Sequence, residues 1–330
     1  MSAHDTRSEG PKSEGQGRRS VLIIAGPTAS GKSAMAMDVA EHFSGTVINA
    51  DSMQVYTELR EVTARPSIED EKRVPHRLFG VLSGAEACSA GRWCEMAVAE
   101  IESCFETGRL PVLVGGTGMY LKSLVEGLSP IPTIAPAFRD QATARHAQLG
   151  ADAFKAEVAT LDPVSAERLP AGDTQRLIRA WEVSTATGKP LSAWQNEPRI
   201  PLLPGVRFAH IALVPPREAL YAGIDARFSR MVEAGALDEV RALLALNFDP
   251  ALPVMKALGV PELSAYLNGE LALEDAIAQA QQVSRNYAKR QLTWVRSQLA
   301  GAHVLSAQYS KRFREEIFSF VHEFLLTERT

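Results

Sequence analysis

This sequence has few cysteines and no long apolar runs. Its three cysteines, Cys88, Cys94 and Cys104, are an odd number without the spacing of a zinc site, as expected in a reducing cytoplasm. No uninterrupted apolar stretch approaches the roughly 20 residues of a membrane span. The N-terminus also lacks the hydrophobic core of a signal peptide. We therefore expect a cytoplasmic protein with no part in a membrane.

An excess of one charge is also absent. The 330 residues include 35 Lys and Arg against 39 Asp and Glu, for a net charge of −4. The whole molecule is therefore not a general binder of polyanions, and any nucleic-acid surface must be a local patch. A hydrophobic content of 45% is ample for the core of one large or two moderate domains. Residues 1–20 are polar and rich in Ser, Gly and Arg, which predicts a disordered tail.

The chain is organised around a strand followed by a glycine-rich loop. The apolar run Val21–Ala25 leads into the pattern G-x-x-x-x-G-K-[ST], made by Gly26, Pro27, Thr28, Ala29, Ser30, Gly31, Lys32 and Ser33. The glycines let successive N–H groups form an anion nest, Lys32 supplies a cation, and Ser33 offers a hydroxyl to Mg²⁺. A helix over 33–42 adds its positive N-terminal end. The pattern predicts a diphosphate or triphosphate site, although a similar turn can also bind nothing.

Two further short strands end in polar residues. The run 46–50 ends at Asp51, and the run 111–114 ends at the glycine-rich segment that contains Thr117. Ligands bind beyond the carboxyl ends of parallel strands, so we expect both residues near the phosphate loop. Asp51 is then either a proton acceptor, a water-mediated Mg²⁺ ligand or a helix N-cap. Thr117 is either an N-cap or a hydroxyl directed at substrate.

The middle and the end of the chain differ from this α/β pattern. Residues 130–204 are helical in pattern with proline-rich ends, which predicts an inserted helical subdomain. Residues 206–214 return as a strand. The expected fold is α/β: a parallel phosphate-loop core made by 21–129 and 205–330, with a helical C-terminal part.

The C-terminal third contains a basic block. Residues 276–314 have no Asp or Glu, and Arg285 and Lys289 share one helix face at i,i+4 spacing. An RNA backbone is bound mainly through such cations. The alternative is a solvated helix face over core aromatics.

Several motifs together resemble one family, the bacterial tRNA dimethylallyltransferases, also called tRNA isopentenyltransferases. The resemblance covers roughly residues 20–300 and is carried by GPTASGKS, ADSMQVY, PVLVGGTGMYLKSLVEGL, GDTQRLIRAWEV, STATGK and RNYAKRQLTW. The phosphate loop is common to many families, whereas the combination of motifs is specific.

The resemblance implies transfer of a dimethylallyl group from its diphosphate to the exocyclic amine of the adenosine 3′ of the anticodon. It implies that the loop, Lys32 and Mg²⁺ hold the leaving diphosphate, and that Arg227 reaches it. It assigns Asp51 as the general base and places Thr117 near the diphosphate or the base. The target adenosine must leave its stack to reach a buried pocket.

The resemblance also implies tRNA contacts. The matching positions are Asp51, Ser52, Met53, Gln54, Thr117, Arg139, Gln175, Arg176, Leu177, Ile178, Arg179, Lys256, Arg285, Lys289 and Arg290. Val260-Pro261 and Gly223 depart from residues that relatives carry. The expected partners are tRNA and dimethylallyl diphosphate, and we expect a monomer. A small-molecule kinase using ATP and a noncatalytic RNA-binding phosphate-loop protein are the alternatives.

Overall fold

The computed structural model describes residues 19–299 and 301–327. The chain forms two compact units. The first is built from the segments up to Lys122 and from Leu203 onward, and the second is Ser123–Leu202. The predicted tail lies outside the described residues except for Arg19 and Ser20. Within the described ranges, every helix is too short or too polar to span a bilayer.

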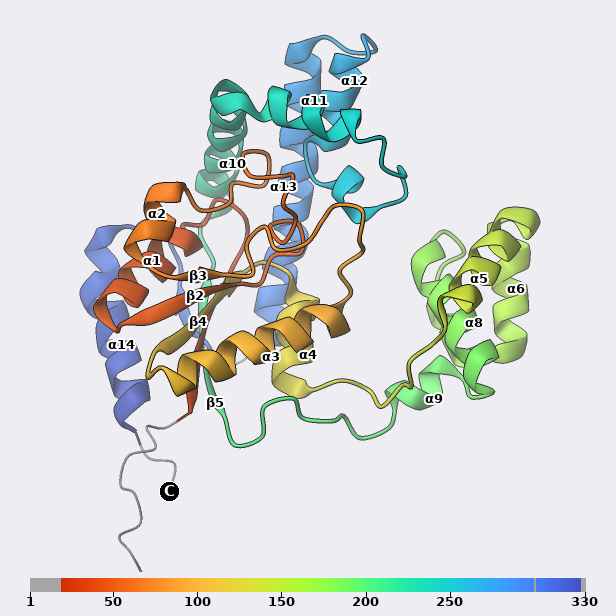
Figure 1. The fold of residues 1–330 in the computed structure, drawn as a ribbon, viewed down its shortest axis with the longest axis horizontal. Coiled ribbons are helices and arrows are strands. Elements are labelled where there is room, and N and C mark those ends of the chain that lie inside the picture. The colour runs from red at the N-terminus through yellow and green to blue at the C-terminus, as the bar shows by residue number, and fades with distance from the viewer. Residues whose placement is uncertain (1–18, 300, 328–330) are drawn as a thin grey trace, which may run out of the picture. The chain divides into compact units, whose positions relative to one another are not determined.

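The first unit is built on one six-stranded sheet. Its strands are β1 (Ser20–Ala25), β2 (Gly45–Asn49), β3 (His76–Arg77), β4 (Leu110–Gly115), β5 (Arg207–Leu213) and β6 (His303–Leu305). Their order is β3-β2-β4-β1-β5-β6, and every pair is parallel. Figure 1 labels strands β2, β3, β4 and β5 of this sheet. The predicted α/β fold with a parallel core is confirmed.

Buried apolar residues on both faces explain why the central strands are almost continuously apolar. On one face, α1 (Lys32–His42) and α14 (Arg314–Leu326) cover side chains such as Leu22, Val112 and Ile211. The alternating residues, including Ile23 and Leu113, are also fully buried. α3 (Ala90–Glu106) packs against β2 and β4 there, and α4 (Gly118–Glu126) follows β4.

The first unit contains further helices. It contains α2 (Ile68–Arg73), α10 (Arg217–Met231), α11 (Leu237–Ala245), α12 (Val260–Leu267) and α13 (Leu273–Gln298). α10 runs into α11 through a π-helical turn, Val232–Ala236. In α13, Ala276, Ala280, Ser284 and Ala288 are buried at every fourth position. Small side chains on one face let the long helix pack closely on α10 and α12.

The second unit is a separate helical body. It contains α5 (Pro136–Leu149), α6 (Ala151–Leu161), α7 (Pro163–Arg168), α8 (Thr174–Thr187) and α9 (Leu191–Gln195). Buried Asp162 holds it together by accepting hydrogen bonds from the backbone and hydroxyl groups of both Ser165 and Ser192. The unit runs from Ser123 to Leu202, whereas 130–204 was expected, and Leu128 pairs with Ile200 between its two connecting segments.

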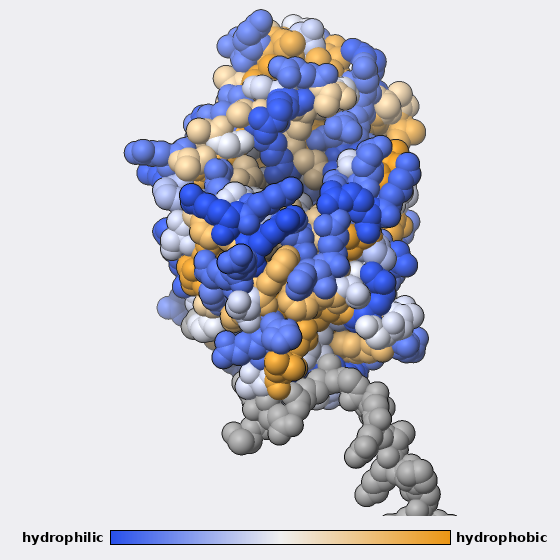
Figure 2. Space-filling view, turned by 90° about the vertical axis from the view of Figure 1, so that its left-hand side faces the viewer, coloured by the Kyte–Doolittle hydropathy of each residue, from blue (hydrophilic) through white to orange (hydrophobic). Residues whose placement is uncertain are grey.

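Figure 2 shows the face seen from the left of Figure 1. It is mainly hydrophilic, and its hydrophobic residues form small separate groups. Apolar residues scattered in this way are normal on a protein surface.

Candidate active site

The polar ends of three adjacent strands meet at one edge of the sheet. β2, β4 and β1 are neighbours, and their carboxyl ends lead into Asp51, Thr117 and the phosphate loop respectively. The Thr117 hydroxyl accepts a hydrogen bond of 2.9 Å from the Ser52 backbone N–H. This is the convergence expected from the sequence, and it follows from the strand order.

The phosphate loop needs its glycines because it is crowded. A Cβ at Gly26 would lie 2.9 Å from the Leu213 carbonyl, and Gly31 has a φ of +92°. Both positions therefore exclude side chains. Lys32 Nζ donates to the Pro27 carbonyl at 2.6 Å, which keeps the ammonium folded over the loop.

Gln291 is a site residue that the sequence analysis did not identify. It lies inside the RNYAKRQLTW motif. Its side chain is 5% exposed. Its Oε1 accepts from the Thr28 N–H at 2.9 Å, and its Nε2 donates to the Gly116 carbonyl at 3.2 Å. Gln291 thus ties the phosphate loop to the glycine-rich segment after β4. Only the fold brings these three segments together.

A cavity of about 540 Å³ lies beside the phosphate loop. Its lining includes Ser33 and four cationic side chains, those of Lys32, Arg65, Arg227 and Arg230, against one carboxylate, Asp70. Such a lining suits a ligand with several negative charges. We call it the cationic cavity.

A second cavity, of about 280 Å³, has a different lining and contains Asp51. Most of its wall is apolar and comes from Val62, Ile224, Phe228, Met231 and Leu258. Arg227 lines both cavities, so a ligand with a charged end and an apolar end can be held across them. We call it the apolar cavity.

Burial changes the charge balance at the phosphate loop. The pKa of Lys32 falls to about 7, mainly because burial disfavours the charged ammonium and then because Arg227 is near, while Asp51 acts in the opposite direction. The pKa of Arg227 is also lowered, again chiefly by burial. Two cations held this close are stabilised by an anion placed between them.

Asp51 begins a turn, and no helix starts there, so the helix N-cap alternative is wrong. Its Oδ1 accepts the Met53 N–H at 2.9 Å, an Asx turn. Neighbouring Tyr287 also lines the apolar cavity, and burial together with Asp51 raises the pKa of its hydroxyl. Asp51 therefore lies where a carboxylate can meet a ligand in the apolar cavity.

The predicted tRNA contacts of the first unit do not all lie in one place. Ser52, Met53, Lys256 and Arg290 line the apolar cavity with Asp51. Lys289 lines a separate hollow with Arg217 and Arg296, and Arg285 pairs with Asp225 at 2.5 Å.

Gln54 has a structural task that the sequence did not reveal. Its Nε2 donates to the carbonyls of Thr63 and Ala64, at 2.9 and 3.0 Å. Its amide therefore supports the loop that contains both residues.

In the second unit the predicted contacts lie on α8 and α5. Arg179 and Arg139 reach Glu182 at 3.0 and 3.7 Å, Arg176 pairs with Asp173 at 2.7 Å, and Gln175 is exposed. Leu177 and Ile178 are buried in the core of this unit, and their assignment as tRNA contacts stays a prediction. They fix α8, which carries the exposed polar residues.

No group of three or more His, Cys, Asp or Glu side chains in residues 19–299 and 301–327 could hold a metal ion.

A family model described as IPP transferase matches residues 54–298. The chain belongs to the IPP transferase family. A relative named tRNA dimethylallyltransferase from Rhodospirillum centenum is 57% identical over 284 residues, covering 86% of this chain and 90% of the relative. One of the same name from Rhodospirillum rubrum is 51% identical over 316 residues, covering 94% and 97%.

Solved IPP transferase structures share the fold. The full-length tRNA isopentenylpyrophosphate transferase from Bacillus halodurans is 31% identical, with a TM-score of 0.67 and coverage of 93% of this chain and 97% of that one. A eukaryotic dimethylallyltransferase described as acting on tRNA is 27% identical, with a TM-score of 0.81, covering 93% and 79%.

Proposed function

We propose that this chain is a tRNA dimethylallyltransferase. It transfers a dimethylallyl group from dimethylallyl diphosphate to the exocyclic amine of the adenosine 3′ of the anticodon in certain tRNAs. The observation that carries the proposal is the pair of cavities that share Arg227, one cationic and one apolar with a carboxylate. Membership of the IPP transferase family supports the same reaction.

The two cavities match the two ends of the donor. The diphosphate is held in the cationic cavity by the loop N–H groups, Lys32 and Arg227, and the apolar cavity takes the five-carbon chain. When the bond between C1 and the diphosphate oxygen breaks, both electrons go to the diphosphate. The preorganised cations stabilise the charge that grows there.

Asp51 serves the acceptor side. The adenine amine is a weak nucleophile because its lone pair is delocalised into the ring. As the new bond from nitrogen to C1 forms, Asp51 takes a proton from the amine, so no cationic amine accumulates. The products are the prenylated adenosine and diphosphate. Thr117 fixes the turn that presents Asp51 through its bond to Ser52.

Mg²⁺ is proposed as the ion that accompanies the diphosphate. Ser33 is the residue of the phosphate loop that would hold it, and Asp70 also lines this cavity. When bound, the ion adds positive charge at the leaving oxygens.

Transfer of labelled dimethylallyl from its diphosphate to tRNA tests the proposal against the alternatives. We expect label in tRNA with this donor and no phosphoryl transfer with ATP. Phosphorylation of a small molecule by ATP, or tRNA binding without transfer, would contradict it.

Lys289 and Arg290 give a prediction about tRNA binding, because they are adjacent in sequence but line different hollows. Lys289→Ala should weaken tRNA binding. It should also make the plot of log affinity against log salt less steep by about 1, since one phosphate contact is lost. Donor binding should stay unchanged. Arg290→Ala should in addition slow single-turnover transfer, because its side chain lines the apolar cavity.

Filter binding over a salt series measures the first effect and quenched-flow transfer the second. If the salt slope of Lys289→Ala equals that of the wild type, Lys289 does not contact the RNA backbone.

A further inference from the structure

One loop forms part of the wall of both cavities. We call residues 60–66 the site loop. Val62 and Thr63 line the apolar cavity, whereas Ala64, Arg65 and Pro66 line the cationic cavity. The segment from residue 59 to 67 contains no helix or strand, so other contacts must hold it in place. Its position decides the shape of both cavities.

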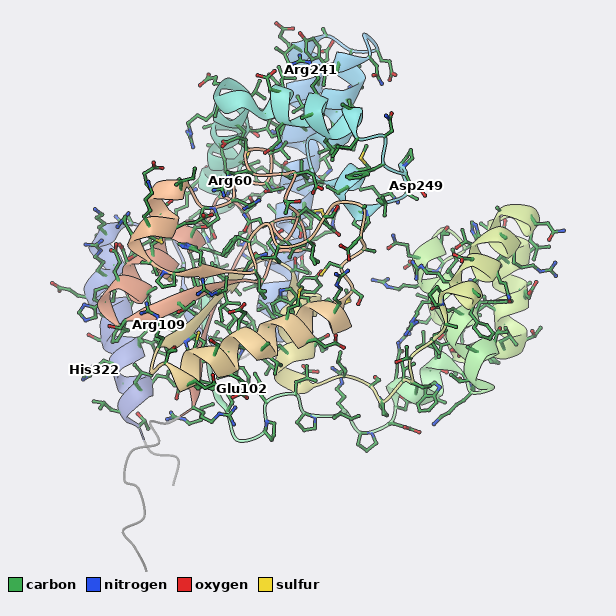
Figure 3. All side chains as sticks on the ribbon, in the orientation of Figure 1. Arg60, Glu102, Arg109, Arg241, Asp249 and His322 are labelled. Carbon is green, nitrogen blue, oxygen red and sulfur yellow. The ribbon has the colours of Figure 1, made fainter. Side chains whose placement is uncertain are left out.

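The start of the site loop is bound by a single carboxylate from far along the chain. Glu239 Oε1 accepts the backbone N–H groups of Arg60 and Glu61, the latter at 2.9 Å. Its Oε2 accepts the Val62 N–H at 2.8 Å. Figure 3 labels Arg60, and Glu239 lies on α11. Three consecutive donors on one ionised group form strong, charge-assisted hydrogen bonds.

Glu239 also connects the site loop to the helices that form another part of the cavity walls. α11 continues from α10 through the π-helical turn Val232–Ala236. α10 supplies Arg227 to both cavities and Arg230 to the cationic cavity. The carboxylate of Glu239 therefore joins two chain segments that bound the same space, while Glu239 itself lines neither cavity.

Hydrogen bonds inside the site loop connect the segment that Glu239 holds to the part of the loop that lines the cationic cavity. Arg65 N–H donates to the Arg60 carbonyl at 2.9 Å, and the Arg65 guanidinium donates to the Tyr56 carbonyl at 3.2 Å. The Arg60 guanidinium donates to the Pro66 carbonyl at 2.5 Å. Fixing the backbone of Arg60 consequently fixes where Arg65 stands in the cavity wall.

We infer that Glu239 is a positioning residue for dimethylallyl transfer: its carboxylate holds the site loop so that Thr63 and Arg65 complete the two cavities. This inference rests on the proposed function. The competing explanation is that Glu239 only stabilises α11, because acidic residues in the first turn of a helix are favourable by themselves.

Asp238 provides a matched control. It lies in the same first turn, its side chain is 82% exposed, and its carboxylate pairs with Arg241. Asp238→Asn removes the same charge from the same helix end without touching the site loop. Glu239→Gln keeps the side-chain length, but its amide NH₂ cannot accept a hydrogen bond, so at least one of the three N–H donors loses its partner.

Hydrogen exchange of the donor-free protein tests the contact itself. In Glu239→Gln, the amides of residues 60–62 should exchange at least about tenfold faster than in the wild type, because local opening becomes easier. The peptide from α11 should keep its protection, and Asp238→Asn should match the wild type in both segments.

Donor binding and single-turnover transfer test the consequence. In Glu239→Gln, we expect weaker binding of dimethylallyl diphosphate and transfer about tenfold to a hundredfold slower with both substrates saturating, because small displacements of catalytic groups are costly. Affinity for tRNA should change less than about twofold, since the basic residues of α13 are untouched. Glu239→Asp, which keeps the charge but reaches less far, should show a smaller effect of the same kind, and it replaces the Gln variant should that variant fail to fold.

If the amides of residues 60–62 exchange as slowly in Glu239→Gln as in the wild type, the inference is overturned. Faster exchange there with unchanged donor affinity and rate, or an equal effect of Asp238→Asn, also overturns it. If the wild type itself does not transfer the group, the proposed function fails. The exchange and donor-binding measurements then still decide whether Glu239 shapes the donor site, because neither needs turnover.

Discussion

Asp51→Ala should lower the single-turnover rate of transfer by about 10²–10⁴-fold, the usual contribution of a positioned proton acceptor. The carboxylate lines the apolar cavity, and it begins a turn at the carboxyl end of β2 that the Thr117 hydroxyl supports. Binding of dimethylallyl diphosphate should not weaken much, because Asp51 carries the same sign of charge as the diphosphate. Quenched-flow measurement with both substrates bound beforehand separates the chemical step from binding.

Asp51→Asn is the matched control for this variant. The asparagine oxygen can still accept the Met53 N–H, so the Asx turn is kept while the base is lost. Both variants should therefore be slow. A near-wild-type rate for Asp51→Asn would limit Asp51 to shaping the turn, and water or another group would have to take the proton.

Much of this fold was predictable because short-range patterns determine it. The apolar runs that end at Ala25, Ala50 and Val114 predicted β1, β2 and β4 to within one or two residues. Their polar ends converge because parallel strands place their carboxyl ends at one edge. The α/β class follows from this pattern, and it is confirmed.

Short strands at the sheet edges were not predictable. β3 is only two residues long, His76–Arg77, and β6 lies in a region that was expected to be helical. Neither has an apolar pattern of its own. Each is defined by pairing with a neighbour, β3 with β2 and β6 with β5, and pairing depends on the tertiary structure.

Side chains that act on distant segments were missed for the same reason. Glu239 bonds to amides 177–179 positions away, and Gln291 bonds to Thr28 across 263 positions. Sequence patterns predict which face of an element is buried, and they do not indicate a polar partner so far along the chain. The catalytic and tRNA-binding roles carried over from the resemblance stay predictions that the variants above test.

Lys32 should couple donor binding to pH. Its pKa of about 7 means that half of the ammonium is neutral near pH 7 in the donor-free protein. A bound diphosphate favours the charged form and raises this pKa, so binding takes up a proton above pH 7. As the pH rises from 7 to 8.5, the dissociation constant of dimethylallyl diphosphate should increase about tenfold. Calorimetry in buffers of different ionisation enthalpy measures the proton uptake directly.

Two substitutions separate the charge of Lys32 from its titration. Lys32→Ala should weaken donor binding, make it independent of pH over this range, and slow transfer about 10²–10³-fold, because a group that stabilises the leaving diphosphate is gone. Lys32→Arg stays protonated throughout, so any binding that it retains should also be independent of pH. If wild-type affinity is constant from pH 7 to 8.5 without proton uptake, Lys32 is already charged in the empty cavity. Burial would then be offset there by the carboxylate of Asp51, the neighbour that acts to raise the pKa of Lys32.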